Sequence, residues 1–319
     1  EDIQVELGVD AALLEGYNKK YEKNYLPAPE SSYSLSSNTT VIKAGHNMSE
    51  EVELTVNSIE EFKEGSTYCI PVTIRSTSAM KVLEASRTLF VVLKTPVISK
   101  AIYLGSNIYR VDSFKQESSL AALPQVTMEA RVYVESFASW DPYISSIMGI
   151  EGVFGVRFGD VKVSPNAVQI CHDSYQPAAE SHKFDTNKWY HVAAVWSGST
   201  FDIYIDGQYA TGVPVGGETI DLTSDNSGGF YIGASYGGGR PLYGYAAEVR
   251  VWTRALSQSE IANNMNYVDP QTEGLLAYWR MNAYEPREGG GNIVKDETGH
   301  GYDAVGGANT PKMMDTKWL

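Results

Sequence analysis

The stretch that decides the fold is GYAAEVRVWTRALSQSEI, residues Gly244–Ile261. Within it, Val249, Val251 and Trp252 form an apolar run that is typical of a strand. The run leads into Ser257–Glu260, whose Ser-x-x-Glu spacing is that of a capping box and predicts the start of one short helix. A strand followed by a single short helix is a distinctive order in a sequence that otherwise indicates strands and turns.

A second stretch, WYHVAAVWSGSTFDIYIDG at Trp189–Gly207, supports the same conclusion. Its apolar side chains occupy every second position, the period of a strand with one buried face. These positions are Phe201, Ile203 and Ile205, and they alternate with Asp202, Tyr204 and Asp206. Asp206-Gly207 then predicts a hairpin turn, because glycine tolerates the positive φ that a two-residue turn requires.

Length and composition predict two β domains. A chain of 319 residues exceeds one ordinary compact core, and 43% apolar residues are enough to fold both parts. The 21 tyrosines and 29 glycines favour strands and turns over helices. We place the boundary between residues 96 and 97, near Thr95-Pro96, and expect no disulfide, because Cys69 and Cys171 fall in different domains.

The net charge of −14 restricts the partners. Nucleic acid and anionic membrane surfaces both require a basic face, so we expect neither as a ligand. The acidity is compatible with a divalent cation or with an uncharged ligand. No apolar run reaches the 18 residues needed to span a bilayer.

The N-terminal part begins with a predicted helix and continues as short strands. We predict a helix over Val9–Tyr25, capped by Asp10, because Leu13, Leu14, Tyr17 and Tyr21 fall on one helical face. The later strands predict a small immunoglobulin-like β-sandwich. Pro71 interrupts one of them, which predicts an edge strand or a bulge.

Residues 1–96 resemble an N-terminal domain common in surface lipoproteins of Bacteroidetes. The matching segments are Gly16-Tyr17-Asn18, Leu26-Pro27, Ser31–Leu35, Ala44-Gly45 and Tyr68–Val72. The resemblance implies export to the bacterial cell surface, a lipid anchor upstream of Glu1 as the only membrane attachment, and a spacer role.

Residues 97–319 contain more than ten predicted strands, which require two stacked sheets. Six segments in order resemble a LamG-like domain of the concanavalin A-like lectin/glucanase superfamily, which implies a jelly-roll sandwich. They are Thr127–Tyr133, Trp189–Val192, Tyr204–Gly207, Phe230–Gly233, Glu248–Ser257 and Gly274–Trp279. The chain departs from the family at Ala247, where Asp is usual, and at Glu297–Gly301, where a Ser-Gly-Asn-Gly run is more common.

Catalysis is not expected. Jelly-roll hydrolases carry acidic residues at alternate positions of one strand, and this sequence contains neither Glu-x-Asp-x-Glu nor Glu-x-Asp-x-x-Glu. Glu129 and Glu135 share a strand face but lie too far apart along it to cooperate. Gly233-Ala234-Ser235-Tyr236-Gly237 matches a nucleophile elbow, but Gly238 to Pro241 cannot continue as the helix that an elbow requires.

Calcium is the expected cofactor. It takes six to eight oxygen ligands from carboxylates and carbonyls. Relatives of this domain often hold one structural Ca²⁺ near the loop equivalent to Asp296–Gly301. The resemblance therefore implies a carboxylate ligand from Asp296 and a carbonyl ligand from Gly301. The alternative is a solvated turn capped by Asp.

Aromatic residues in loops are the candidate ligand-binding groups. Sugars stack their apolar faces on exposed rings, while carboxylates and arginines bind their hydroxyl groups. The candidates form three groups, and the alternative for each ring is packing over the sandwich edge. They are Trp140 and Tyr143; His172 and Tyr175; and Tyr236, Arg240 and Tyr243. Trp189, Trp252 and Trp279 lie in strand segments and are expected in the core.

These observations predict a non-catalytic protein of the bacterial surface that binds an oligosaccharide or polysaccharide and captures glycan. Two alternatives stay open: an adhesion or structural module that binds protein, and a glycoside hydrolase whose carboxylates meet only in space.

Overall fold

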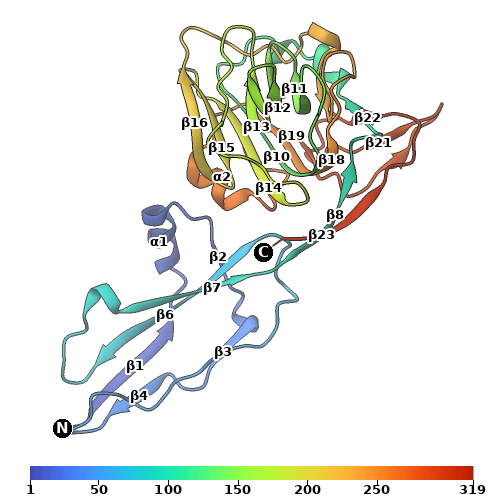
Figure 1. Ribbon diagram of the computed structural model, residues 1–319. Helices are drawn as coiled ribbons and strands as arrows, with labels where there is room; N and C mark the ends of the chain where they lie inside the picture. The colour runs from blue at the N-terminus through green and yellow to red at the C-terminus, as the bar shows by residue number, and fades with distance from the viewer. Residues whose placement is uncertain (319) are drawn as a thin grey trace. The chain divides into compact units, whose positions relative to one another are not determined.

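The computed structural model describes residues 1–318 and shows two compact units, Glu1–Val97 and Ile98–Trp318 (Figure 1). Both are built mainly of strands, so the predicted all-β class is confirmed. No helix within residues 1–318 is long and apolar enough to cross a membrane.

The N-terminal unit consists of a five-stranded sheet, a two-stranded ribbon and the helix α1 (Leu13–Tyr21). Within the sheet, β2 and β1 pair along one edge of β6, β7 pairs along its other edge, and β4 pairs with β1. The ribbon is formed by β3 and β5. The strands are β1 (Ile3–Val9), β2 (Leu26–Pro27), β3 (Tyr33–Leu35), β4 (Thr39–Ile42), β5 (Leu54–Val56), β6 (Thr67–Thr77) and β7 (Thr88–Lys94).

The helix predicted over Val9–Tyr25 is wrong at both ends. Residues up to Val9 form β1, which pairs with β4 on one side and β6 on the other. Helix α1 covers nine residues, and Glu22 ends it in the left-handed conformation at φ 51°. Asp10 is not the N-cap; it lies two residues before the N-cap, Ala12, and its carboxylate accepts the Ala12 N–H at 3.1 Å. At Val9, pairing with Val72 of β6 outweighed the helical spacing of the apolar residues.

The edge position predicted from Pro71 is also wrong, because β6 has neighbours on both sides. On one side it pairs continuously with β7. On the other side β2 pairs as far as Cys69 and β1 pairs from Val72, so Pro71 lies at the gap between two partners. Its carbonyl, which points to that gap, accepts the Asp10 N–H at 3.0 Å. The N–H that proline lacks would point to the same side, where no strand requires it.

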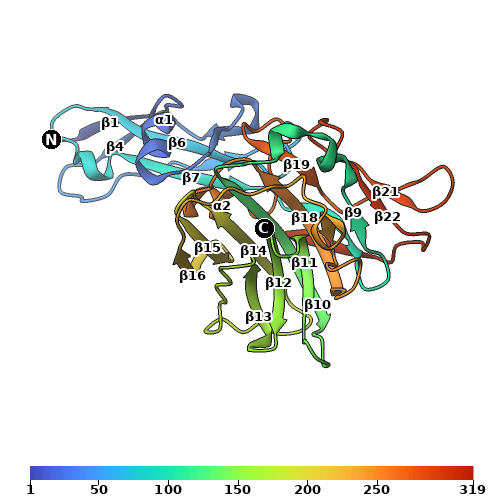
Figure 2. The ribbon, with the colours of Figure 1, turned by 90° about the horizontal axis from the view of Figure 1, so that it is seen from above.

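The C-terminal unit stacks two large sheets face to face (Figures 1 and 2). The first, sheet C, has the order β16-β15-β14-β10-β18-β8-β23, with β19 also pairing β18. The second, sheet D, has the order β13-β12-β11-β17-β9-β22-β21-β20. The predicted jelly-roll sandwich is therefore confirmed.

Most neighbouring strands in the two sheets run antiparallel to each other. The strands of sheet C are β8 (Val97–Tyr103), β10 (Val126–Ser136), β14 (Trp189–Trp196), β15 (Thr200–Ile205), β16 (Gln208–Pro214), β18 (Tyr243–Trp252), β19 (Leu275–Trp279) and β23 (Met313–Trp318). Those of sheet D are β9 (Tyr109–Arg110), β11 (Ser145–Ile150), β12 (Phe154–Asp160), β13 (Val163–Cys171), β17 (Tyr231–Ile232), β20 (Glu285–Pro286), β21 (Asn292–Val294) and β22 (Ala304–Gly306).

The main core lies between the sheets, as the period-two pattern predicts. In β10, Met128, Ala130 and Val132 are buried there, and the intervening residues face the other side of sheet C. Phe154 of sheet D stacks on Phe201 of sheet C at 5.5 Å between ring centroids. Trp252 and Trp279 are fully buried, as expected, whereas Trp189 is only partly buried and meets Trp318 edge-on.

The two decisive stretches fold as predicted. Ser257 caps helix α2 (Gln258–Asn264): its hydroxyl accepts the Glu260 N–H at 3.3 Å, and Glu260 accepts the Ser257 N–H at 2.8 Å. Asp206 and Gly207 both have positive φ and join β15 to β16 in a hairpin. Helix α2 packs its Ile261 against the outer side of sheet C with Ala193 and Val195, opposite the main core.

Candidate functional site

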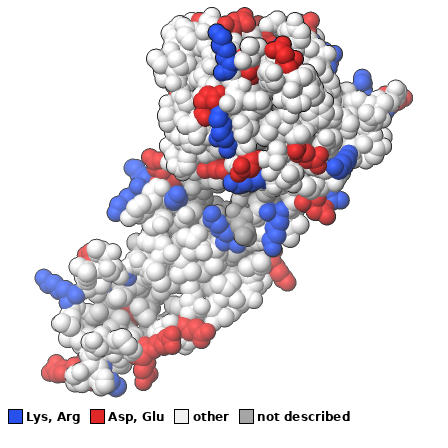
Figure 3. Space-filling view, in the orientation of Figure 1, with Lys and Arg blue, Asp and Glu red and all other residues white. Residues whose placement is uncertain are grey.

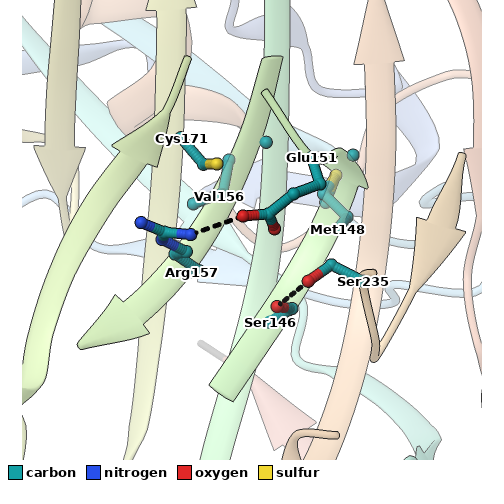
Figure 4. A pocket seen from close by; sticks show the side chains of 9 residues that line it. Ser146, Met148, Glu151, Val156, Arg157, Cys171 and Ser235 are labelled. Atoms are coloured by element: carbon teal, nitrogen blue, oxygen red, sulfur yellow. Dashed lines mark hydrogen bonds and ion pairs between the residues drawn. The ribbon is translucent and has the colours of Figure 1, made fainter. Parts of the chain in front are cut away.

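A small pocket opens on the outer side of sheet D, over β11, β12 and β13 (Figure 4). Alternation along β12 buries Phe154, Val156 and Phe158 in the core and turns Gly155 and Arg157 outward. We call this opening the Arg157 pocket. Its lining residues are Ser146, Met148, Gly149, Glu151, Gly155, Val156, Arg157, Cys171 and Ser235.

Arg157 is the centre of the pocket and is held between two carboxylates. Its Nη1 lies 2.7 Å from Glu151 Oε1, and its Nη2 lies 2.5 Å from Asp160 Oδ2. Its Nε donates to Gln169 Oε1 at 2.9 Å. The side chain of Arg157 is only 5% exposed, so its position is set by these three partners.

Arg240 joins this network from a distant loop, and its guanidinium lies over the exposed ring of Tyr236. Its Nη1 lies 2.6 Å from the same Glu151 Oε1. Its guanidinium lies 4.6 Å from the centroid of the Tyr236 ring, and Tyr236 is 63% exposed. The Arg240 carbonyl accepts the Ser146 N–H at 2.9 Å, which fixes the loop against β11. The result is a charged pocket bordered by a supported aromatic face.

The electrostatics keep Glu151 ionised. Burial alone raises the pKa of Glu151, but Arg157 and Arg240 outweigh burial, and the pKa is lowered overall. Cys171 behaves in the opposite way, because burial raises the pKa of its thiol to about 11. The thiol is therefore protonated at neutral pH, and the carboxylate supplies the negative charge of the pocket.

The remaining predicted ring positions divide into exposed and buried groups. Trp140 is 56% exposed and meets the partly buried Tyr243 ring edge-on at 6.2 Å, while Tyr143 is exposed at the next turn. Gly159 allows β12 to approach Tyr143, because a Cβ there would lie 2.1 Å from the Tyr143 carbonyl oxygen. Trp140, Tyr143 and Tyr236 thus present rings to solvent.

His172 and Tyr175 pack inward instead. The His172 ring lies 5.1 Å from Phe201 and 5.8 Å from Tyr175, and burial lowers the pKa of His172. Tyr175 packs against the main core. The structure therefore gives no support to a ligand contact by these two side chains.

Ser235 does not form a nucleophile elbow. Its hydroxyl accepts a hydrogen bond from Ser146 Oγ at 2.8 Å (Figure 4). The chain after it forms a tight turn in which Gly239 pairs back to Ser235, with no helix following. Both serines belong to the wall of the Arg157 pocket.

A second charged cluster lies on the outer side of sheet C and is closed to solvent. Arg250 donates to Glu129 at 3.0 Å and to Glu248 at 2.8 Å, and Trp252 Nε1 donates to Glu129 at 3.0 Å. Tyr278 donates to Glu248, and His191 Nε2 lies 3.1 Å from Glu129. We call these residues the Glu129 network, which consists of Glu129, His191, Glu248, Arg250 and Tyr278, all at most 1% exposed.

The Glu129 network also holds helix α2 in place. Arg250 donates to the carbonyl of Asn264, the last residue of α2, and Arg131 donates to the next carbonyl, that of Met265. Cations at a helix C-terminus satisfy carbonyls that have no partner within the helix. Burial raises the pKa of Glu129, but Arg250 and His191 outweigh it and bring the pKa to about 2. This cluster is structural, because α2 and its flanking loops cover it.

The residues around Asp296 do not fit the predicted calcium site. Its carboxylate already accepts hydrogen bonds from the backbone N–H groups of Tyr278, Thr298 and Tyr302, and from the Thr298 hydroxyl. No group of three or more His, Cys, Asp or Glu side chains within residues 1–318 is arranged to hold a metal ion. Calcium bound by Asp296 and Gly301 therefore stays a prediction without support from the geometry.

Comparison with known families agrees with this architecture. Residues 112–262 match the model of the concanavalin A-like lectin/glucanases superfamily. This match lies within the C-terminal unit. Residues 1–81 match a second family model, which describes an N-terminal domain. No curated protein matches the chain.

Three solved structures illustrate what the chain is similar to. A crystal structure from Bacteroides ovatus ATCC 8483, of a protein proposed to bind carbohydrate, is 28% identical, has a TM-score of 0.67, and aligns over 98% of this chain and 88% of its own. The SAP-like pentraxin of Limulus polyphemus is 15% identical with a TM-score of 0.41, over 66% and 95% of the two chains. Trypanosoma rangeli sialidase is 19% identical with a TM-score of 0.38, over 55% and 28%. At these two lower TM-scores, neither structure bears on the function of the concanavalin A-like domain.

The sequence alone did not point to Glu151, Arg157, Asp160 or Gln169. One signal was available for Arg157, because it occupies an outward position between Val156 and Phe158 in a strand whose other face is apolar. Its carboxylate partners and the Arg240 loop meet it only in the folded domain.

Proposed function

We propose that the concanavalin A-like domain binds carbohydrate without catalysis, at the Arg157 pocket. The observation that carries the proposal is the exposed Tyr236 ring stacked on Arg240 beside the Glu151–Arg157 pair. A sugar ring has an apolar face that stacks on an aromatic side chain and an edge of hydroxyl groups that carboxylates and arginines bind. The pocket supplies the charged groups, and the Tyr236 ring, which follows Ser235 of the pocket wall, supplies an aromatic face beside it.

The electrostatics of the pocket support binding over hydrolysis. A glycosidase requires one carboxylic acid with a raised pKa, which protonates the leaving oxygen, and a second carboxylate nearby. Glu151 has a lowered pKa because two guanidinium groups face it. Asp160 is the second carboxylate, and it pairs with the same Arg157. Both groups serve to position arginine.

The similarity to the Bacteroides ovatus protein supports the same ligand class. The agreement covers nearly the whole chain, so the N-terminal unit is included in it. We extend the proposal to display at a bacterial cell surface, with the N-terminal unit as a spacer and glycan capture as the role. This extension rests on the resemblance of residues 1–96 to surface lipoproteins.

Thermal unfolding with a panel of plant and host oligosaccharides tests the proposal. A ligand at a hundredfold its Kd stabilises the folded state by about 2.7 kcal/mol. For a domain of this size, that free energy raises the Tm by about 5–10 °C. A shift with one sugar class supports carbohydrate binding and identifies the class. No shift with any sugar, in a folded sample, contradicts it and favours a protein ligand.

A further inference from the structure

The charges of the Arg157 pocket are balanced within the protein. Arg157 pairs with Glu151 and Asp160, and Arg240 pairs with Glu151. Three donor nitrogens of Arg157 already have protein acceptors, Glu151, Asp160 and Gln169. Neither arginine is therefore an unneutralised cation that an acidic ligand could pair with.

A third carboxylate adds negative charge at the border of the pocket. Asp173 follows β13, and its N–H donates to the Gly152 carbonyl at 2.9 Å, next to Glu151. Its Oδ1 lies close enough to Gly152 that a Cβ at that glycine would be 2.4 Å away. Glu151 and Asp160 pair with the two guanidinium groups, and Asp173 beside Gly152 is a further carboxylate, so the three carboxylates exceed the two arginines by one negative charge.

The consequences differ for charged and uncharged sugars. A sugar carboxylate or sulfate would lose its hydration and meet the excess negative charge, which is unfavourable. Hydroxyl groups donate to carboxylates and accept from guanidinium groups, so adjacent hydroxyls can contact the Glu151–Arg157 and Glu151–Arg240 pairs without separating them.

We infer that the Arg157 pocket selects uncharged sugars with adjacent free hydroxyl groups and rejects acidic ones. The inference rests on the proposed carbohydrate binding at the same site, and it specifies the ligand class. It agrees with the mixed charges seen on the surface in Figure 3, where acidic and basic side chains are interspersed on the visible face of the C-terminal unit.

The test measures binding of the full chain to paired oligosaccharides that differ in charge. Suitable pairs are lactose with sialyllactose, and methyl-esterified galacturonate oligomers with the free acids, within a wider array of uncharged glycans. We expect uncharged glycans as the strongest ligands and at least tenfold weaker binding of the acidic member of any pair that binds. Equal or stronger binding of acidic members overturns the inference and leaves carbohydrate binding intact. Binding of no glycan overturns the proposed function itself, and the inference with it.

Glu151→Gln provides the second arm of the test. The substitution removes the charge that neutralises both arginines, so we expect uncharged glycans to bind at least tenfold more weakly and acidic glycans to gain affinity. Glu135→Gln on sheet C is the matched control, with the same change in charge, and leaves both affinities unchanged. Should Glu151→Gln fail to fold, Asp173→Asn at the border replaces it, with a smaller gain for acidic glycans. Unchanged selectivity in the folded variant contradicts the inference.

Discussion

The two outer faces of the concanavalin A-like domain carry the same ionic arrangement with opposite accessibility. On sheet C, Arg250 lies between Glu129 and Glu248. On sheet D, Arg157 lies between Glu151 and Asp160. Helix α2 and its flanking loops cover the first arginine completely, whereas the second lies below an opening bordered by Tyr236. A charged cluster is thus structural where the chain closes over it, and a candidate binding site where exposed rings border it.

The largest expected effect separates the two clusters by stability. Glu129→Gln removes one of the two carboxylates that neutralise the buried charge of Arg250. Breaking such a buried ion pair lowers the free energy of unfolding by about 3–5 kcal/mol. Glu151→Gln costs less, about 1–3 kcal/mol, because Glu151 and Arg240 still reach solvent. Urea unfolding followed by fluorescence measures both values. Equal losses would show that accessibility does not distinguish the clusters.

Acid unfolding tests the Glu129 network through two groups with opposite charge. Burial lowers the pKa of His191 below its ordinary value of 6.5. As the pH falls, His191 is therefore protonated in the unfolded chain before it is protonated in the folded protein, and the free energy of unfolding decreases below about pH 6.5. The pKa of Glu129 is about 2 when folded and 4.5 otherwise, so its contribution is present above pH 4.5 and is lost between pH 4.5 and 2. The contribution of Glu129 to the free energy of unfolding that is lost in this pH range is about 3 kcal/mol.

The control for the acid experiment is Glu129→Gln, which removes the loss between pH 4.5 and 2 relative to the parent protein. The measurement is the free energy of unfolding in urea at a series of pH values. Parallel curves for the two proteins across that window would contradict the assignment of Glu129.

Tyr236→Ala tests the open face, with a smaller effect than either glutamate variant. Removing the stacking ring is expected to weaken glycan binding about two- to tenfold, since such a contact contributes about 0.5–1.5 kcal/mol. Tyr209→Ala is the matched control, because Tyr209 is similarly exposed, at 52%, but lies on β16 of sheet C. Calorimetric titration with a glycan found in the panel gives both affinities. Equal weakening by the two variants would remove Tyr236 from the site.

The smallest expected effect concerns calcium. Because the Asp296 carboxylate already accepts several hydrogen bonds from the protein, we expect EDTA to change the Tm by less than about 1 °C. A clear fall in the Tm, restored by added calcium, would instead establish the cation predicted from the resemblance. The Asp296→Asn variant then shows whether this loop holds it.

Local patterns predicted much of the C-terminal fold. The alternation in β10 and β15, the capping box of α2 and the Asp206-Gly207 hairpin all depend on residues a few positions apart. The N-terminal predictions failed where distant pairing decided the outcome. Val9 joined a strand because it pairs with Val72 of β6, and Pro71 lies between two partner strands that its own sequence does not reveal.

The candidate site shows the same division. Loop aromatics could be predicted as candidates, and Trp140, Tyr143 and Tyr236 are exposed, but composition could not show that His172 and Tyr175 turn inward toward Phe201. The β architecture and the capped helix could be predicted from the sequence, because those features depend on short-range spacing. Only the tertiary structure decided which charges meet: Glu151 and Arg240 are 89 residues apart and become partners because sheet D brings their loops together over β11 and β12.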